Sequence, residues 1–258
     1  MIETARHAAQ LGGDVVARYY REGVEMRGKQ SYNLVSDADI DAERAVVQAI
    51  REAYPDHAIL AEEEHHDSAE SEHLWVVDPL DGTNNFAHHI PHFAVSIAYY
   101  HQGVAQCGAV YNPIREDWYT AVRGEGAQHN GQPIHVSDCT DLGQVLVGLG
   151  FYYDRGDGML ATLAAAADFF RCNIHGVRRF GTASLDLAQV ACGMFGAFFE
   201  FELKPWDFGA GRLLVEEAGG RITTCTGEEV PLKSTSMLAS NGHLHAQSLA
   251  ITSKHFKS

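Results

Sequence analysis

Four acidic residues, each close behind an apolar segment typical of a buried strand, could together bind metal ions. They are Glu62, Asp78, Asp81 and Asp207. Carboxylates brought into one pocket repel one another strongly unless cations neutralise their charge. Oxygen ligands of this kind favour Mg²⁺ or Mn²⁺ over zinc. Two adjacent divalent ions suit the hydrolysis of a phosphate ester, because one activates water and the other stabilises the leaving oxygen.

The central stretch, residues 75–86, could supply metal ligands and a phosphate site from one short turn. Its apolar start predicts the end of a buried strand, and a proline then stiffens a turn that lets Asp78 and Asp81 converge on one hard cation. Gly82 and Thr83 suit the start of a helix, whose free N–H groups attract an anion. The alternative is an ordinary strand-to-helix turn with a capping acid.

Asp39, Asp207 and the acids at 62–67 also have ordinary structural explanations. Ser36 and Asp39 have the spacing of a capping box at the start of a helix. Asp207 follows a proline near the start of another predicted helix and would normally be an N-cap. Acidic clusters such as residues 62–67 are most often solvated loops. At this point both interpretations of each acid stay open.

Composition limits the classes of partner. The chain has 258 residues, enough for one large domain or two small ones, and a formal net charge of −15. This charge disfavours a nucleic acid or an anionic membrane as the main partner. No apolar run reaches membrane-spanning length and the first residues have no signal-peptide core, so we expect a cytoplasmic protein.

The cysteines and histidines do not predict a metal site. Five cysteines without a C-x-x-C pair predict reduced thiols in the core. The adjacent histidines at 65–66 and 88–89, with His92, predict surface loops, because neighbouring side chains on a strand point to opposite faces. Arg178 and Arg179 could contact a substrate or a subunit interface, but a solvated pair is the simpler interpretation.

The predicted elements change in character near residue 138. Before it, two helices over about residues 2–21 and 36–53 precede mostly antiparallel strands, with a tight turn at Asn130-Gly131. After it, strands and helices alternate, as in α/β proteins. We therefore predict an α+β part, residues 1–138, with the metal-binding motifs, and an α/β part, residues 139–258, that contributes Asp207. The later strands are predicted near 145–148, 177–180, 197–203, 221–224 and 237–239, and the later helices at 159–172, 184–191, 207–218 and 244–254.

The motifs closely resemble those of the inositol monophosphatase family, magnesium-dependent and lithium-sensitive phosphatases related to fructose bisphosphatase. The resemblance extends to about Gly242 and implies the layered α-β-α-β-α sandwich of that superfamily, and a homodimer. The matching stretches are Glu62-Glu63, Asp78-Pro79-Leu80-Asp81-Gly82-Thr83, Trp206-Asp207 and Glu216-Glu217-Ala218-Gly219-Gly220.

The resemblance implies a role for each matching position. The implied cofactor is Mg²⁺, two to three ions per site, with Mn²⁺ as an alternative. Its ligands would be Glu62, Asp78, the main-chain carbonyl of Leu80, Asp81 and Asp207. The implied catalytic residues are Glu62 together with Thr83 and Asp39, which would orient the attacking water. The implied substrate contacts are Leu80, Asp81, Gly82, Thr83, Asp207, the segment Gly181-Thr182-Ala183 and Glu200. Of these, the segment 181–183 and Glu200 would contact the hydroxyl groups of the sugar or cyclitol.

The implied activity is hydrolysis of inositol 1-phosphate without a covalent intermediate. Alternative substrates are histidinol phosphate, fructose 1,6-bisphosphate and a nucleotide 3′-phosphate. Glu200 suits neutral vicinal hydroxyls and would repel a second phosphate. Residues 150–155 resemble a bacterial variety of the family, which leaves the substrate open. A function of another class is regulatory binding at the transcription machinery, because some bacterial relatives with this resemblance act there.

Overall fold

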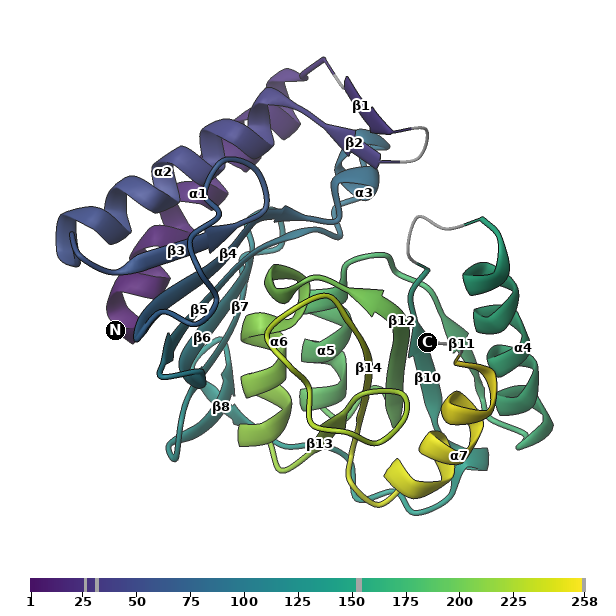
Figure 1. The fold of residues 1–258 in the computed structure, drawn as a ribbon. Helices are drawn as coiled ribbons and strands as arrows, with labels where there is room; N and C mark the ends of the chain where they lie inside the picture. The colour runs from purple at the N-terminus through teal and green to yellow at the C-terminus, as the bar shows by residue number, and fades with distance from the viewer. Residues whose placement is uncertain (26, 31–32, 152–154, 257–258) are drawn as a thin grey trace.

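The computed structural model describes the chain except residues 26, 31–32, 152–154 and 257–258; of residues 28–30 and 33–35 it describes only the backbone. Helices and two large sheets alternate in five layers, α-β-α-β-α, as expected (Figure 1). A two-stranded ribbon, β1 (Arg27–Gln30) with β2 (Asn33–Val35), lies beside the first layer.

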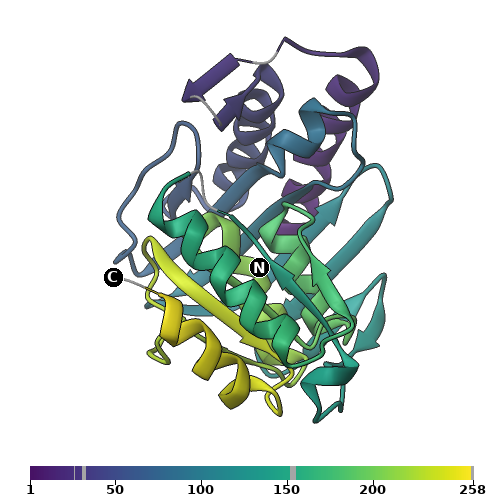
Figure 2. The same ribbon diagram turned by 90° about the vertical axis from the view of Figure 1, so that its right-hand side faces the viewer.

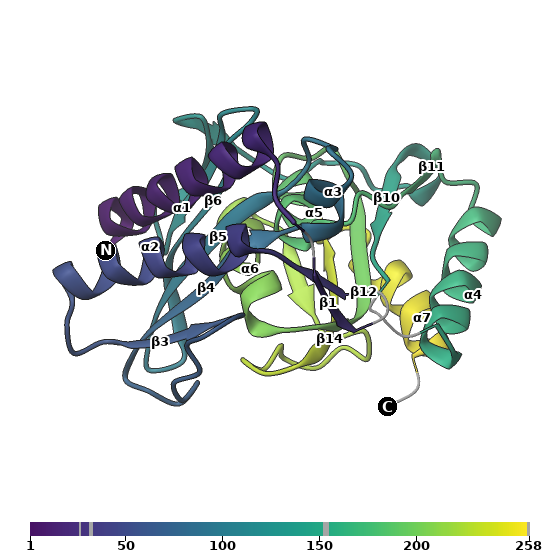
Figure 3. The same ribbon diagram turned by 90° about the horizontal axis from the view of Figure 1, so that it is seen from above.

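The first layer consists of α1 (Ile2–Glu22) and α2 (Asp37–Ala53), which lie side by side on one face of the larger sheet (Figure 3). Both helices are amphipathic, and most of their alanines and valines are buried on the face toward the strands. Small residues let the helices approach the sheet closely. At Gly13, for example, an added Cβ would lie 2.6 Å from the Tyr111 ring.

The larger sheet has seven strands in the order β3-β4-β5-β6-β7-β8-β9. Only its β3–β4 pair is parallel; the others are antiparallel, as predicted for this part of the chain. Asn130 (φ 50°) and Gly131 (φ 76°) make the predicted tight turn between the last two strands. The bounds are β3 (Ala58–Ala61), β4 (His73–Asp81), β5 (Ala94–His101), β6 (Val104–Asn112), β7 (Asp117–Val122), β8 (Gly126–His129) and β9 (Gln132–Ile134).

The smaller sheet has five strands in the order β11-β10-β12-β14-β13 and is mixed. β10 is parallel to β11 and β12, whereas β14 is antiparallel to β12 and β13. The bounds are β10 (Leu146–Leu149), β11 (Gly176–Arg178), β12 (Ala197–Leu203), β13 (Arg221–Thr223) and β14 (Thr235–Ser240). A short 3₁₀ helix, Leu142–Gln144, leads into β10.

Two helices fill the space between the sheets, and two cover the outer face of the smaller one. The inner pair is α5 (Ala183–Ala191) and α6 (Pro205–Glu217), and α6 packs on β4, β5, β6 and β7 of the larger sheet. The outer pair is α4 (Asp157–Arg171) and α7 (His245–His255), seen in front in Figure 2. The close approach of α6 needs a glycine: a Cβ on Gly108 would lie 3.0 Å from the Ala210 Cα.

Two local predictions differ from the structure. The strand that was expected to end at Val77 continues to Asp81, with an irregular register between Asp78 and Asp81 that accommodates Pro79. The cysteines are all free thiols, but only Cys107 and Cys225 are buried; Cys172 is exposed, and Cys139 and Cys192 are partly exposed. Among the described residues, no helix has the length and apolar character needed to cross a bilayer.

Candidate active site

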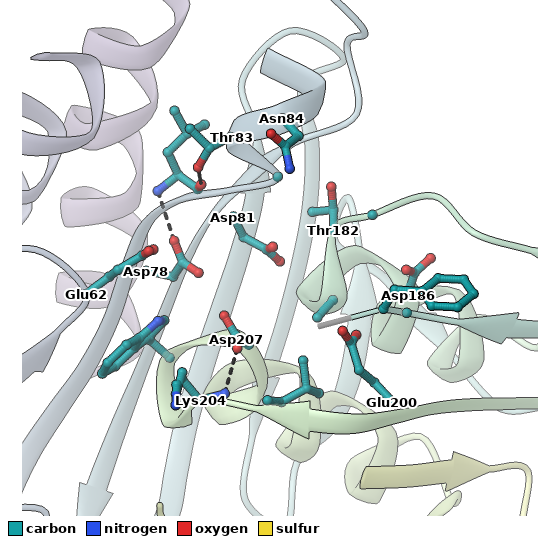
Figure 4. Close-up of a pocket in the computed structure, with 18 of the residues that line it drawn as sticks. Glu62, Asp78, Asp81, Thr83, Asn84, Thr182, Asp186, Glu200, Lys204 and Asp207 are labelled. Atoms are coloured by element: carbon teal, nitrogen blue, oxygen red, sulfur yellow. Dashed lines mark hydrogen bonds between the residues drawn. The ribbon is translucent and has the colours of Figure 1, made fainter. Parts of the chain in front are cut away.

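A cavity of about 310 Å³ lies where the ends of β4, α5, β12 and α6 meet (Figure 4). All four acids of the predicted metal set line it, and so do the predicted substrate residues of the 80–83 and 181–183 segments and Glu200. Its wall consists of Glu62, Asp78, Leu80, Asp81, Gly82, Thr83, Asn84, Gly150, Phe151, Arg179, Gly181, Thr182, Ala183, Asp186, Glu200, Leu203, Lys204, Trp206 and Asp207.

The irregular end of β4 holds two of the carboxylates in place. Asp78 is 1% exposed, and its Oδ1 accepts a hydrogen bond from the Leu80 backbone N–H at 3.0 Å. Asp81 is 8% exposed, and its Oδ2 accepts hydrogen bonds from the backbone N–H (2.7 Å) and hydroxyl (2.6 Å) of Ser184 on α5. The shift in register turns both acids toward the same cavity, although a regular strand would place residues three apart on opposite faces.

Glu62 and Asp207 reach the cavity from different layers. Glu62 directly follows β3, whose parallel pairing with β4 brings the carboxyl ends of both strands to the same sheet edge. Asp207 lies in the first turn of α6, where its Oδ2 accepts a hydrogen bond from the Lys204 backbone N–H at 2.6 Å. Asp207 is therefore not the N-cap, which is Lys204, but the third residue of the helix, which accepts the N-cap's backbone hydrogen bond and also lines the cavity (Figure 4).

Asp39 caps α2 and contacts the cavity residue Thr83, although it does not itself line the cavity. Its Oδ2 accepts hydrogen bonds from the backbone N–H (2.7 Å) and hydroxyl (2.8 Å) of Ser36, which completes the predicted capping box of α2. Its Oδ1 lies 3.2 Å from the Thr83 hydroxyl, which is also 3.1 Å from the Leu80 carbonyl. The hydroxyl has one proton for these two acceptors, so its lone pairs remain available to a proton donated by water.

Burial and mutual repulsion make the carboxyl groups hard to ionise. Burial, with the charges of Glu62, Asp81 and Asp207, holds the pKa of Asp78 well above its ordinary value. Burial raises the pKa of Asp81 to about 6 against the opposing hydrogen bonds of Ser184. Burial and the charge of Asp81 also raise the pKa of Asp207 well above its ordinary value. The pocket therefore favours either protons or cations among these oxygens.

The donor set fits Mg²⁺ or Mn²⁺. It contains four carboxylates and the main-chain carbonyl of Leu80, all of them hard oxygen ligands, and no thiolate or imidazole among the residues that line the cavity. Burial and, after it, the neighbouring charges raise these pKa values, and a cation here would offset both effects. The residues that would hold it are Glu62, Asp78, Leu80, Asp81 and Asp207.

A buried acid, Glu200, lies in the cavity wall opposite Glu62, close to the backbone of residue 150. Glu200 on β12 is 8% exposed, and burial raises its pKa to about 8, although Arg179 opposes this and Asp186 adds to it. The Glu200 carboxylate in this position leaves no space for a side chain at residue 150, since a Cβ on Gly150 would lie 1.8 Å from Glu200 Oε2. Gly82 (φ 96°) is similarly required, because a Cβ would lie 2.4 Å from the Thr182 hydroxyl.

Asp186 and Arg179 belong to this wall. The sequence interpretation missed Asp186, and for Arg179 it left a substrate contact open beside a solvated pair. Asp186 is 1% exposed in α5, and its Oδ1 has no hydrogen-bond partner among the described residues. The available signal was an acid in the first turn of an otherwise apolar helix directly after Gly181-Thr182-Ala183. Arg178 and Arg179 are both exposed, as expected of a solvated pair, and Arg179 also lines the cavity. Residues 152–154, in the stretch that resembles a bacterial variety, lie outside the described residues.

Glu43 is a second missed residue and fixes the loop that carries Glu62. Its fully buried carboxylate accepts hydrogen bonds from the backbone N–H groups of Glu63 (2.7 Å), Glu64 (2.8 Å) and His65 (3.1 Å), and pairs with His65 Nδ1 at 2.8 Å. The acid-rich loop is therefore not simply solvated. It wraps around a buried carboxylate on α2.

Replacing Glu43 with Ala is expected to destabilise the fold by about 3 kcal/mol, because it leaves three loop N–H groups and His65 without their acceptor. Mg²⁺ affinity should fall with it, since Glu62 directly precedes this loop. Urea unfolding and isothermal titration with Mg²⁺ measure the two effects. The matched control is Glu64→Ala, which removes only an exposed pair with Arg44 and should change little. Unchanged Mg²⁺ affinity in Glu43→Ala would show that the loop does not depend on this anchor.

Comparison with known proteins agrees with this architecture over the whole chain. A sequence model of the Inositol monophosphatase family matches residues 1–257. A protein of Neisseria meningitidis serogroup B named as a putative Nus factor SuhB is 44% identical over 257 residues, covering 98% of each chain. The crystal structure of the extragenic suppressor protein SuhB from Bartonella henselae superposes with a TM-score of 0.91 at 35% identity, covering 98% of each chain.

An enzyme structure is almost as similar. The inositol monophosphatase from Anabaena (Nostoc) sp. PCC 7120 superposes with a TM-score of 0.88 at 36% identity, covering 98% of this chain and 95% of that one. The matches to the family model and to these relatives span nearly all of the chain, and the five-layer fold agrees with them. The chain belongs to the inositol monophosphatase family.

Proposed function

We propose that the protein is a Mg²⁺-dependent phosphomonoester hydrolase that converts inositol 1-phosphate, or a closely similar polyol phosphate, to the free polyol and phosphate. The observation that carries the proposal is the convergence of four carboxylates on one cavity: Glu62 directly after β3, Asp78 and Asp81 on β4, and Asp207 on α6. Burial raises the pKa values of the three aspartates, so cations would be favoured beside them. Family membership and the Anabaena enzyme support the reaction class.

The residues of this chain can position a water for attack on phosphorus. Thr83, whose hydroxyl proton points to Asp39 or to the Leu80 carbonyl, can accept a hydrogen bond from a water in the cavity. As the water oxygen bonds to phosphorus, its proton can pass through the Thr83 hydroxyl to Asp39, and the ester oxygen leaves and takes up a proton. When bound, Mg²⁺ supplies the positive charge that lowers the pKa of water and offsets the phosphoryl charge.

The backbone after Asp81 and the far wall would hold the substrate. The short helix α3 (Thr83–Ala87) starts after Gly82, so the first N–H groups of this turn have no acceptor within the helix and can face a phosphate. The segment Gly181-Thr182-Ala183 and Glu200 line the cavity. Figure 4 shows Thr182 and Glu200 on the side away from Glu62, where a polyol would extend. We further propose a cytoplasmic homodimer that lithium inhibits.

The proposal is tested by assaying phosphorylated metabolites with and without Mg²⁺ and ranking them by kcat/KM. The panel contains inositol 1-phosphate, histidinol phosphate, fructose 1,6-bisphosphate and a nucleoside 3′-phosphate. We expect Mg²⁺-dependent release of phosphate, with inositol 1-phosphate ranked first. No turnover of any of them with Mg²⁺ or Mn²⁺ would refute the enzymatic proposal, whereas another first-ranked compound would correct only the substrate.

Glu200 should make substrate discrimination depend on pH. Because burial raises its pKa to about 8, the ion-free protein holds it mostly protonated at neutral pH, and bound cations would lower this pKa. Discrimination against fructose 1,6-bisphosphate relative to inositol 1-phosphate should therefore strengthen as the pH rises toward about 8, since the carboxylate repels a second phosphate. The ratio of the two kcat/KM values measures this.

The matched variants separate Glu200 from general pH effects. In Glu200→Gln the ratio of the two kcat/KM values should no longer change with pH. Above about pH 8 its kcat/KM for fructose 1,6-bisphosphate, relative to inositol 1-phosphate, should be about tenfold higher than in the unmodified protein. Glu229→Gln, at a side chain that is 92% exposed, should behave as the unmodified protein. An unchanged pH profile in Glu200→Gln would assign the discrimination to another group.

A second candidate is a regulatory role in transcription, and one observation favours it: the Neisseria relative, 44% identical along nearly the whole chain, is named as a putative Nus factor. The two roles are compatible, because binding to RNA polymerase would use the surface and hydrolysis uses the cavity. Co-purification with RNA polymerase, measured together with phosphatase turnover, distinguishes them. Polymerase binding without any Mg²⁺-dependent turnover would favour the regulatory role alone.

A further inference from the structure

A second group of ligand-type side chains lies at the start of β4, at the opposite end of the strand from Asp78. His73 and His101 face each other across the antiparallel β4–β5 pair, and Glu72 directly precedes His73. One ligand atom from each of these three residues lies within 4.8 Å of the other two. We propose that Glu72, His73 and His101 form a binding site for a divalent transition-metal ion such as Cu²⁺ or Zn²⁺, separate from the carboxylate cavity.

The backbone register places the two imidazoles close together. The Gln102 N–H donates to the Glu72 carbonyl at 2.8 Å, which extends the β4–β5 pairing one step beyond His73 and His101. In an antiparallel ladder the pair next to a hydrogen-bonded pair is a non-hydrogen-bonded one, whose side chains approach each other most closely. The two rings are indeed stacked, with centroids 4.9 Å apart and planes inclined by 17°.

One of the proposed ligands is already oriented. His73 Nδ1 lies 2.7 Å from the Tyr99 hydroxyl, which leaves Nε2 as its metal-binding nitrogen. A hydrogen bond at the second ring nitrogen is the usual way in which proteins orient a metal-binding histidine. The His57 ring also stacks on His73, at 4.6 Å and 6°, and His57 is in turn held by the Trp75 indole N–H at 3.1 Å.

The other two ligands are accessible and can adjust. The His101 side chain is 41% exposed and the Glu72 side chain 65% exposed, and His101 Nε2 lies 3.6 Å from Glu72 Oε1. The stacked rings must tilt apart for both nitrogens to point at one ion, and exposure gives His101 the room to rotate. The site thus combines one fixed imidazole with two ligands that solvent-borne ions can reach.

The chemistry of this site differs from that of the active-site cavity. Two imidazoles and one carboxylate suit Zn²⁺ or Cu²⁺, whereas the oxygen-only cavity suits Mg²⁺. The five residue steps from His73 to Asp78 span about 16 Å of strand, so one ion cannot occupy both places. Glu72 also ends the loop that begins at Glu62, so an ion would tie this loop to β5. The proposal runs against the sequence-based expectation that no histidine binds metal.

Copper electron paramagnetic resonance tests the proposal on the full-length, tag-free protein. Saturating Mg²⁺ is added first to fill the carboxylate cavity, followed by one equivalent of Cu²⁺. We expect a single type-2 signal with superhyperfine coupling to imidazole nitrogen, which oxygen ligands cannot produce. His73→Gln and His101→Gln should each remove coupling from one nitrogen and weaken Zn²⁺ binding by at least about tenfold in a competition titration. Glu72→Gln should weaken Zn²⁺ binding less.

His88→Gln is the matched control, because His88 is exposed on another loop. It should leave the copper signal and the Zn²⁺ affinity unchanged. Circular dichroism verifies that His73→Gln and His101→Gln are folded, and His101→Gln, at an exposed side chain, gives an independent result if His73→Gln is not. Nitrogen coupling and Zn²⁺ affinity that persist unchanged in folded His101→Gln would overturn the proposal. A copper signal with oxygen ligands only would overturn it as well.

Discussion

Replacing Asp81 with Asn is expected to lower kcat by roughly 10³-fold or more while leaving the fold intact, since it removes a proposed metal ligand worth about 4 kcal/mol to the transition state. The amide oxygen of Asn can still accept the hydrogen bonds that Ser184 donates to Asp81. Steady-state turnover of inositol 1-phosphate at saturating Mg²⁺ measures the effect. Retained turnover in folded Asp81→Asn would remove the metal-dependent scheme.

The same variant should be more stable than the unmodified protein in Mg²⁺-free buffer. Burial raises the pKa of Asp81 from about 4 in the unfolded chain to about 6 in the folded one. A raised pKa destabilises the folded state as the pH rises: the effect is absent below about pH 4 and complete above about pH 6. Asn does not ionise, so urea unfolding at neutral pH should show a gain. Asp56→Asn, in an exposed turn, should change neither stability nor turnover.

Removing divalent ions is expected to lower stability strongly at about pH 8 and hardly at all at about pH 5. Without cations, Asp78, Asp81 and Asp207 have raised pKa values, so stability is lost as the pH rises through them. With cations at about 100 times their dissociation constant, binding adds about 2.7 kcal/mol to the folded state. At low pH the acids are protonated and bind no ion. Thermal unfolding with EDTA and with Mg²⁺ at both pH values measures this.

A variant of one ligand provides the control for this ion effect. Asp207→Asn should reduce the difference between EDTA and Mg²⁺ at about pH 8 and should raise stability in EDTA. Asp56→Asn should retain the full difference. If EDTA lowered the unfolding temperature equally at both pH values, the ions would not be binding through ionisable oxygens in this pocket.

The elements and the main cavity residues were accessible from the sequence because their signals are local. Apolar spacing defined the helices and strands, and the acids at strand ends defined the pocket. The instructive cases are Asp39 and Asp207, for which helix capping and a place in the site were weighed as alternatives. Each has two carboxylate oxygens: in Asp39 one caps the helix and the other faces Thr83. Local and functional interpretations therefore do not exclude each other for such a residue.

The residues that the sequence did not reveal depend on contacts between distant segments. Glu43 has the pattern of an ordinary helix acid, and only the return of residues 63–65 over α2 shows what it binds. His73 and His101 are brought together by strand register, which one sequence does not specify. The division at residue 138 stays a prediction. The parts before and after residue 138 share an interface, because α6 of the second part packs on the larger sheet of the first.

The buried acids of the cavity also bear on how proteins of this shape can change over evolutionary time. In an ion-free chain, Asp78, Asp81 and Asp207 oppose folding at neutral pH, so a neutral replacement gains stability as it loses catalysis. A substitution that converts such an enzyme into a non-catalytic binding protein would therefore increase its folding stability. This chain carries all of these acids, so it has not undergone that substitution.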